Sequence, residues 1–352
     1  APPSVQYEKL QLVMERYGFT PAVAGGVEAT CSMGGQIMPP VMGAVAFIMS
    51  ETIDVPYVEI ATAAIIPALL YFFACFWSVH LEAGKHGLAG LPKDELPSFV
   101  REVRANWYLI LPLFVLVYLL FGGFTPLFSG AVALALTVVL ILGLAIAAGL
   151  PVTAVRVLFW IALGLVCAIS IWFSVAVVAL VTLALIVPAW LSGRGKEALV
   201  GCRWALADGA RQALPVGLAC ALVGIIIGTM TLTGLGTIVG NFVVAIGENN
   251  LPLALVLVMV FSLILGMGIP TIPNYIITSS LAAPILLHLG VPLLVSHMYV
   301  FYFGIMADLT PPVALAAFAA APMARGSGLR IAVQAGRIAL PAFIVAYLAG
   351  AD

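Results

Sequence analysis

The sequence consists largely of long apolar segments, and a helix needs about 20 consecutive apolar residues to cross the hydrocarbon core of a bilayer. The run 154–192 has no charged residue after Arg156, and at about 1.5 Å per residue it is too long for one crossing. We therefore divide it near Ser170. The predicted segments are 22–50, 57–79, 107–122, 126–147, 154–169, 172–192, 213–233, 251–288, 294–321 and 331–350.

Charge supports a membrane assignment and gives it a direction. Only 8% of the residues are charged and 63% are hydrophobic, against roughly 25% charged in a soluble domain. Lys and Arg concentrate in cytoplasmic loops, and every basic cluster lies on one side if 22–50 crosses outward. The rule then requires 251–288 to enter and leave on the outer side, as a re-entrant hairpin. The basic clusters lie within 9–16, 80–106, 193–212 and 322–337.

Glycine and proline interrupt three apolar segments: SMGGQIMPP at 32–40, GMGIPTIPN at 266–274 and ADLTPP at 307–312. Proline removes a backbone donor and frees a carbonyl of the preceding turn. Irregular backbone persists at membrane depth only where protein or a watery cavity surrounds it. Simple kinks are the alternative, since both residues are common in transmembrane helices. The doubled prolines favour ion and substrate sites instead.

The first and third breaks resemble each other. GGQIMPPVMGAVAF and ADLTPPVALAAF share a similar pattern around their proline pairs, and the predicted crossings place them on helices of opposite direction. Opposed broken helices that meet at the midplane are typical of inverted-repeat secondary transporters. We therefore predict an all-α polytopic membrane protein with an inverted-repeat fold, a re-entrant hairpin and two broken helices.

Two acidic residues lie in or near the breaks, and intramembrane carboxyl groups are functional candidates by default. Asp308 is expected to bind a cation or carry a proton, or else to cap the half-helix that follows it. Glu28 could do either of the first two as well, but a packing or end-of-span role is the expectation. The aromatic cluster of His297, Tyr299 and Tyr302 is expected to form an interfacial anchor rather than to face a substrate.

The remaining motifs mark packing and surface. Gly224 and Gly228 form a GxxxG pair, which is expected to pack closely against another helix. The segments 80–106 and 195–212 are predicted to be amphipathic helices on the cytoplasmic face. Motifs of nucleotide-driven motors and familiar hydrolases do not occur. We expect a protein that is not an enzyme, has no nucleic-acid partner and draws its energy from an ion gradient.

The motif-bearing segments resemble the large membrane subunit of tripartite ATP-independent periplasmic (TRAP) transporters, in the DctM-like branch of fused permeases. The resemblance implies a multi-pass inner-membrane importer in contact with lipid, with a fixed scaffold and a moving, elevator-type transport domain of the ion transporter superfamily. It also implies symport of small organic acids with Na⁺, delivery by a periplasmic binding protein, and no cofactor beyond the coupling ion. The matching segments are GGVEATCSMGGQIMPPVMGAVAFIMSE, LEAGKHGLAGLPKDELPSF, TLTGLG, GMGIPT and HMYVFYFGIMADLTPPVALAAFAAAPMA.

The resemblance also implies which residues bind. The first cation site would be formed by Ser32, Gly34, Gly35 and Pro39. The second would be formed by Gly266, Gly268, Thr271, Asp308 and Thr310. Substrate contacts would come from Pro40, Thr271, Asn274, Pro311 and Pro312.

The resemblance divides the chain into four parts. The end of a first hairpin and the first broken helix occupy 1–56, and scaffold and connecting helices occupy 57–250. The re-entrant hairpin and second broken helix occupy 251–321, and a last transmembrane helix occupies 322–352. The start, APPSVQYEKLQ, does not resemble the hairpin tip that the family has there. We therefore expect an N-terminally truncated permease.

Basic residues do not occur near the breaks. A substrate carboxylate would then be met by half-helix N-termini, hydroxyl groups and bound Na⁺. Two alternatives to a carrier are an ion or solute channel, since broken helices also line pores, and an inactive remnant of a permease.

Overall fold

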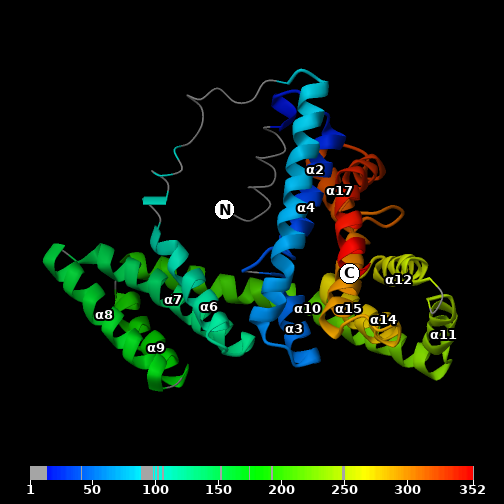
Figure 1. Cartoon of the computed structure of the whole chain (residues 1–352). Helices are drawn as coiled ribbons and strands as arrows, with labels where there is room; N and C mark the ends of the chain where they lie inside the picture. The colour runs from blue at the N-terminus through cyan, green and yellow to red at the C-terminus, as the bar shows by residue number, and fades with distance from the viewer. Residues whose placement is uncertain are drawn as a thin grey trace. The chain divides into compact units, whose positions relative to one another are not determined.

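The computed structural model describes residues 14–40, 42–88, 98, 100, 103–104, 107–150, 153–173, 175–191, 193–247 and 250–351. All regular elements in this part of the chain are helices (Figure 1), which confirms the predicted all-α class. Four of these helices are long and apolar enough to cross a membrane. They are α4 (Tyr57–Lys85), α7 (Pro126–Gly149), α10 (Gly193–Leu232) over Gly195–Leu232, and α17 (Gly328–Ala351) over Gly328–Gly350.

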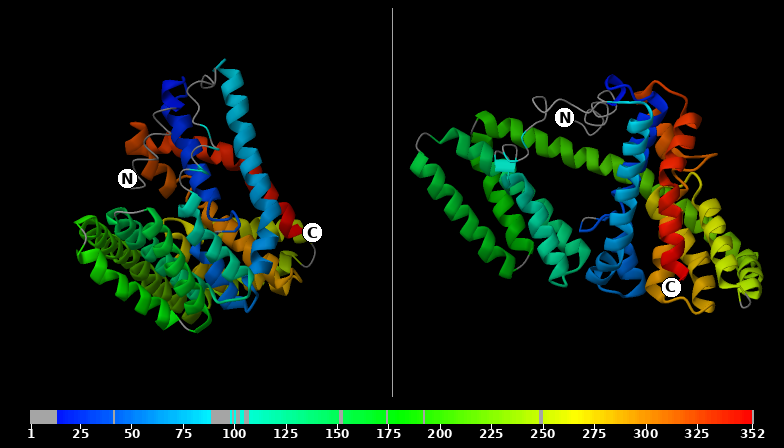
Figure 2. Two further views of the ribbon diagram at one scale, coloured as in Figure 1. Left: turned by 90° about the vertical axis from the view of Figure 1, so that its left-hand side faces the viewer. Right: turned by 45° about the horizontal axis from the view of Figure 1, so that its top comes forward.

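The chain forms two compact units, and the first comprises residues 1–96 and 216–352. In this unit α17 packs along α2, α4 and α16, and Figures 1 and 2 show α2, α4 and α17 side by side. Its other helices are α2 (Pro21–Gly34), α3 (Ala44–Ile53), α11 (Leu235–Gly247), α12 (Leu251–Gly266), α13 (Thr271–Leu281), α14 (Ala283–His288), α15 (Leu293–Met306) and α16 (Leu315–Ala324).

Small residues let these helices approach closely. A Cβ atom on Gly25 would lie 3.1 Å from Ile331, and one on Gly26 would lie 3.0 Å from Gln334 and 3.1 Å from the backbone nitrogen of Ala335. The buried face of α17 is rich in alanine, including Ala335 and Ala339. Close backbone packing through small residues is the main way in which membrane helices associate. The pairing of α2 with α17 thus follows from the composition of their facing sides.

The second unit, residues 97–215, is a separate helical layer. Its core joins α7, α8 and α9 through buried side chains such as Leu142, Leu163 and Leu185, with Gly143 against Trp160. Many outward-facing side chains are apolar and exposed, as expected of helices surrounded by lipid. Its elements are η2 (Trp107–Ile110), α6 (Leu111–Phe121), α7, α8 (Thr153–Phe173), α9 (Val175–Leu191) and the first part of α10.

Several predicted boundaries were wrong. The division of 154–192 comes later than Ser170, since α8 continues to Phe173. Instead of an amphipathic helix over 195–212 and a separate span, α10 is continuous through Pro215. The helix α11 was not predicted, because 13 apolar residues fall short of a span.

Two other expectations concern packing and the cytoplasmic surface. A Cβ atom placed on Gly224 or Gly228 would meet no other helix of the described part of the chain within 4 Å. The expected GxxxG contact is therefore not formed there. The predicted amphipathic helix 80–106 begins within α4, which ends at Lys85. Its core residues Leu96 and Phe99 lie outside the described residues.

Candidate functional site

Two helices of the first unit are broken in the same way. The first is interrupted between α2, which ends at Gly34, and α3, which begins at Ala44. The second is interrupted between α15, which ends at Met306, and α16, which begins at Leu315. Both proline pairs lie within these interruptions, and both Pro–Pro peptide bonds are cis. The breaks therefore occur where the proline and glycine pattern predicts them.

The two broken helices run in opposite directions. The helix α2 packs against α16, and α3 packs against α15, so the first half of each lies beside the second half of the other. In Figure 1 the chain descends from α2 to α3 and rises from α15 to the orange-red α16. The opposed arrangement expected from the sequence is thus observed.

The hairpin between α12 and α13 places its tip on the second break. The chain turns at Gly268, where φ is +75°, a backbone conformation that favours glycine. A Cβ atom on Gly268 would lie 3.5 Å from Val313, and one on Gly266 would lie 3.0 Å from Ala307. The predicted residues Gly266 and Gly268 are therefore brought to the segment that carries the predicted Asp308 and Thr310.

The first break is held chiefly by α4. The Tyr57 hydroxyl donates to the Pro40 carbonyl at 2.8 Å, and the Tyr71 hydroxyl donates to the Thr30 carbonyl at 2.7 Å. A Cβ atom on Gly34 would lie 2.5 Å from the Tyr71 ring. Only glycine therefore fits between α2 and this tyrosine.

The predicted residues of the first break do not all point inward. Gly34 is buried and Pro39 is half-buried, whereas Ser32, Gly35 and Pro40 are exposed. The contacts described above join this break to α4, and the hairpin tip contacts the other break. The elements of this break, α2 and α3, also pack against α16 and α13 of the hairpin and second break.

Around the second break the predicted residues differ in burial. Asp308 is buried, Thr271 and Thr310 are half-buried, and Pro311 and Pro312 are exposed. The Thr310 hydroxyl donates to the Ala307 carbonyl at 3.4 Å. The first residue of α13 is Thr271, so its backbone lies at a helix N-terminus.

Both intramembrane carboxyl groups are buried. Asp308 and Glu28 are each 6% exposed, and neither Asp308 Oδ1 nor Glu28 Oε2 has a hydrogen-bond partner among the described residues. Asp308 does not cap the next half-helix with its carboxylate. The N-cap position of α16 is Ala314, no side chain caps the helix there, and the Asp308 backbone carbonyl accepts from Ala316 instead. Glu28 lies in the middle of α2, the first half of the broken helix, and is buried there.

The expected aromatic anchor was wrong, because its members are buried between helices. The side chains of His297, Tyr299 and Tyr302 are 2–7% exposed. His297 Nδ1 lies 2.8 Å from the Tyr275 hydroxyl, and the Tyr299 hydroxyl donates to the Leu255 carbonyl at 2.8 Å. These aromatic groups fix α15 to α12 and α13 and do not face lipid.

Sequence reasoning missed Tyr57 and Tyr71. Both belong to the buried face of α4, which also contains Ile60, Ala64 and Ala68. This spacing of three to four residues is the signature of one helix face. Tracing that face would have identified the two tyrosines as inward-pointing hydroxyl donors.

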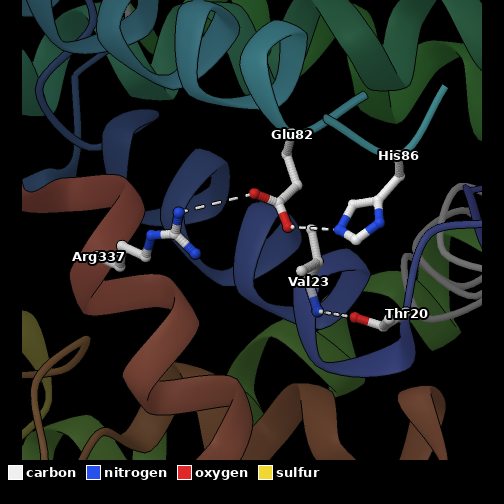
Figure 3. Close-up of polar contacts among 5 residues, drawn as sticks. All are labelled: Thr20, Val23, Glu82, His86 and Arg337. Atoms are coloured by element: carbon white, nitrogen blue, oxygen red, sulfur yellow. Dashed lines mark hydrogen bonds and ion pairs between the residues drawn. The ribbon is translucent and has the colours of Figure 1, made fainter. Parts of the chain in front are cut away.

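A polar cluster lies away from the breaks, at the basic ends of α4 and α17. Figure 3 shows Glu82 between His86, at 3.3 Å, and Arg337, at 3.7 Å. Nearby, the Thr20 hydroxyl caps α2 by accepting from the Val23 backbone nitrogen at 3.4 Å. Exposed ion pairs of this kind contribute less than about 1 kcal/mol. The cluster serves as a minor contact between α4 and α17.

Comparison with known proteins places the chain among membrane transport components. A family model described as "Tripartite ATP-independent periplasmic transporter, DctM component" matches residues 10–157 and 142–349. No curated protein matches the chain.

Proposed function

Since the chain belongs to the DctM family of tripartite ATP-independent periplasmic transporter components, we propose that it is the permease of a Na⁺-coupled importer of small organic acids. The family consists of solute transporters rather than enzymes, and it implies a small solute and a periplasmic binding protein as partners. Sodium coupling, the carboxylate class of the substrate and the elevator motion are our proposals.

The observation that carries the proposal is the hairpin tip packed against the second break. It gathers oxygen-bearing groups from two segments that are distant in sequence: backbone carbonyls, the Thr310 hydroxyl and the buried Asp308 carboxylate. Unwound backbone and half-helix C-termini are the usual Na⁺ ligands of secondary transporters. We assign the second cation site to Gly266, Gly268, Thr271, Asp308 and Thr310.

The first break supplies a second candidate cation site, with Ser32, Gly34, Gly35 and Pro39. Its ligands would be mainly backbone carbonyls, because the carboxyl group of Glu28 lies earlier in α2. A site without a carboxylate ligand has a smaller electrostatic attraction for a cation than one that contains Asp308. We therefore expect the first site to be the weaker of the two.

Substrate recognition is proposed to rest on dipoles and bound Na⁺. Pro40, Thr271, Pro311 and Pro312 are the proposed contacts, and each is exposed or half-buried. The positive N-terminal end of α13, at Thr271, is suited to a carboxylate. Asn274 is only 1% exposed, so we do not assign it to the substrate contacts.

Charge explains how the two solutes are coupled. A substrate carboxylate without Na⁺ would add its negative charge to that of Asp308 in a low-dielectric region, which is costly. Na⁺ at the two cation sites offsets both carboxylates, so the fully loaded transport domain crosses readily. Downhill Na⁺ entry then drives uptake of the acid by alternating access.

Uptake into proteoliposomes tests this function. The permease, with the other components of its transporter and its binding protein, is given labelled small carboxylates with an inward Na⁺ gradient or an equal choline gradient. We expect saturable uptake of the carboxylate with the Na⁺ gradient and none with the choline gradient. Asp308→Ala should reduce this uptake at least tenfold, since removing a charged ligand costs more than about 1.4 kcal/mol. Flux that is non-saturating and indifferent to Na⁺ would instead indicate a channel.

A further inference from the structure

The side chain of Asn274 connects the hairpin to the second broken helix. Asn274 lies in the first turn of α13, and its Nδ2 donates to the carbonyl of Gly304 at 2.7 Å. Gly304 lies in the last turn of α15, and its carbonyl also accepts from the backbone nitrogen of Ala307 at 3.2 Å. The hairpin amide is therefore a second donor to a carbonyl at the end of the first half of the broken helix.

Two glycines make room for this amide. A Cβ atom on Gly266 would lie 2.7 Å from Asn274 Nδ2, and one on Gly304 would lie 2.7 Å from Asn274 Oδ1. Any larger residue at either position would push the amide away from its carbonyl partner. The end of α12, the start of α13 and the end of α15 thus meet at one buried side chain.

The same region contains two buried oxygen acceptors. Asn274 Oδ1 and Asp308 Oδ1 are both buried, and neither has a hydrogen-bond partner in the described part of the chain. The C-terminal end of α15 adds the negative pole of its helix dipole. A cation offsets such an excess of acceptors, provided that the segments carrying them are held at a fixed spacing.

We propose that Asn274 is a positioning residue that fastens the hairpin tip to the second break before any cation arrives. The tip and α15 then form one rigid cradle, and the cation does not have to order the tip when it binds. Ordering a loop on binding lowers affinity, and a preorganised site avoids that cost. The expected effect on Na⁺ rests on the proposed function, whereas the attachment of the tip does not.

Two substitutions of Asn274 separate the hydrogen bond from packing. Asn274→Leu keeps a branched side chain of similar shape between Gly266 and Gly304 but removes the donor, and Asn274→Ala also removes the packing. Thr278→Val is the matched control. Thr278 is equally buried, one turn further along α13, and its hydroxyl donates to the Asn274 carbonyl of the same helix at 2.9 Å.

The decisive measurement is hydrogen exchange of the tip, residues 266–273, in the purified complete transporter without Na⁺. Both Asn274 variants should exchange about three- to tenfold faster there, the range expected for loss of one hydrogen bond, while Thr278→Val matches the unmodified protein. Unchanged tip exchange in both Asn274 variants would overturn the proposal. If neither can be purified folded, Gly304→Ala provides the test, since its methyl group displaces the amide and should likewise speed tip exchange.

Sodium dependence adds a readout that a purely structural residue would not change. The Na⁺ concentration that half-saturates thermal stabilisation should rise about three- to tenfold in Asn274→Leu, while the maximal uptake rate at saturating Na⁺ is retained. An unchanged half-saturating Na⁺ concentration would contradict a positioning role. If Na⁺ has no effect on the unmodified protein, the proposed function fails, and the exchange comparison still decides whether Asn274 holds the tip.

Discussion

At the scale of single residues, the breaks are stabilised by side chains that donate to backbone carbonyls. Tyr57 donates to Pro40, Tyr71 to Thr30 and Asn274 to Gly304. Each of these hydrogen bonds ties a carbonyl in or beside a break to a neighbouring helix, and one such bond contributes about 1 kcal/mol. The sequence does not reveal these pairs, because a backbone acceptor carries no residue-specific signal.

The bond from Tyr57 can be removed without changing packing. Tyr57→Phe should lower thermal stability modestly, by about 1 kcal/mol. If Pro40 faces the substrate, the same change should raise the substrate concentration for half-maximal uptake. The control is Tyr118→Phe, at a position that is 76% exposed, which should alter neither quantity. Equal behaviour of the two variants would show that Tyr57 does not hold the first break.

At the scale of helices, local chemistry determined which features were predictable. Proline and glycine act within one turn, so the two breaks and the turn at Gly268 were located from the sequence. The continuity of α10 and the presence of α11 were not, because each depends on competition between a short apolar segment and its neighbours. Similarly, the GxxxG pair at Gly224 and Gly228 was misread, since helix packing depends on which face meets a partner.

The close pairing of α2 with α17 gives a prediction at this scale. Gly26→Ala should destabilise the protein by roughly 1–3 kcal/mol, because the new methyl group meets the backbone of α17. Gly336→Ala on α17 has open space around the new atom. It should be neutral or slightly stabilising, since alanine favours helix by about 1 kcal/mol over glycine. Thermal unfolding in detergent compares the two; equal melting temperatures would contradict the described packing.

At the scale of the first unit, two opposed broken helices are combined with a hairpin whose tip packs on one of them. The sequence predicted this arrangement because similar motifs recur on segments of opposite direction. Gly266 and Gly268 of the hairpin tip contact the second break, as the predicted second site requires. The burial of single side chains was less predictable, since it depends on residues distant in sequence. Asn274 illustrates the difference, as it was expected at the substrate and is instead buried against α15.

The central claim is that the hairpin tip and the second break bind Na⁺. Its most direct test is the Na⁺ concentration that half-saturates thermal stabilisation of the purified transporter, with choline chloride at equal ionic strength as reference. We predict stabilisation by Na⁺ alone and a half-saturating concentration at least about tenfold higher in Asp308→Asn, while Glu82→Gln, in the distant ion pair, leaves it unchanged. Equal stabilisation by Na⁺ and choline, or an unchanged curve in Asp308→Asn, would contradict the account.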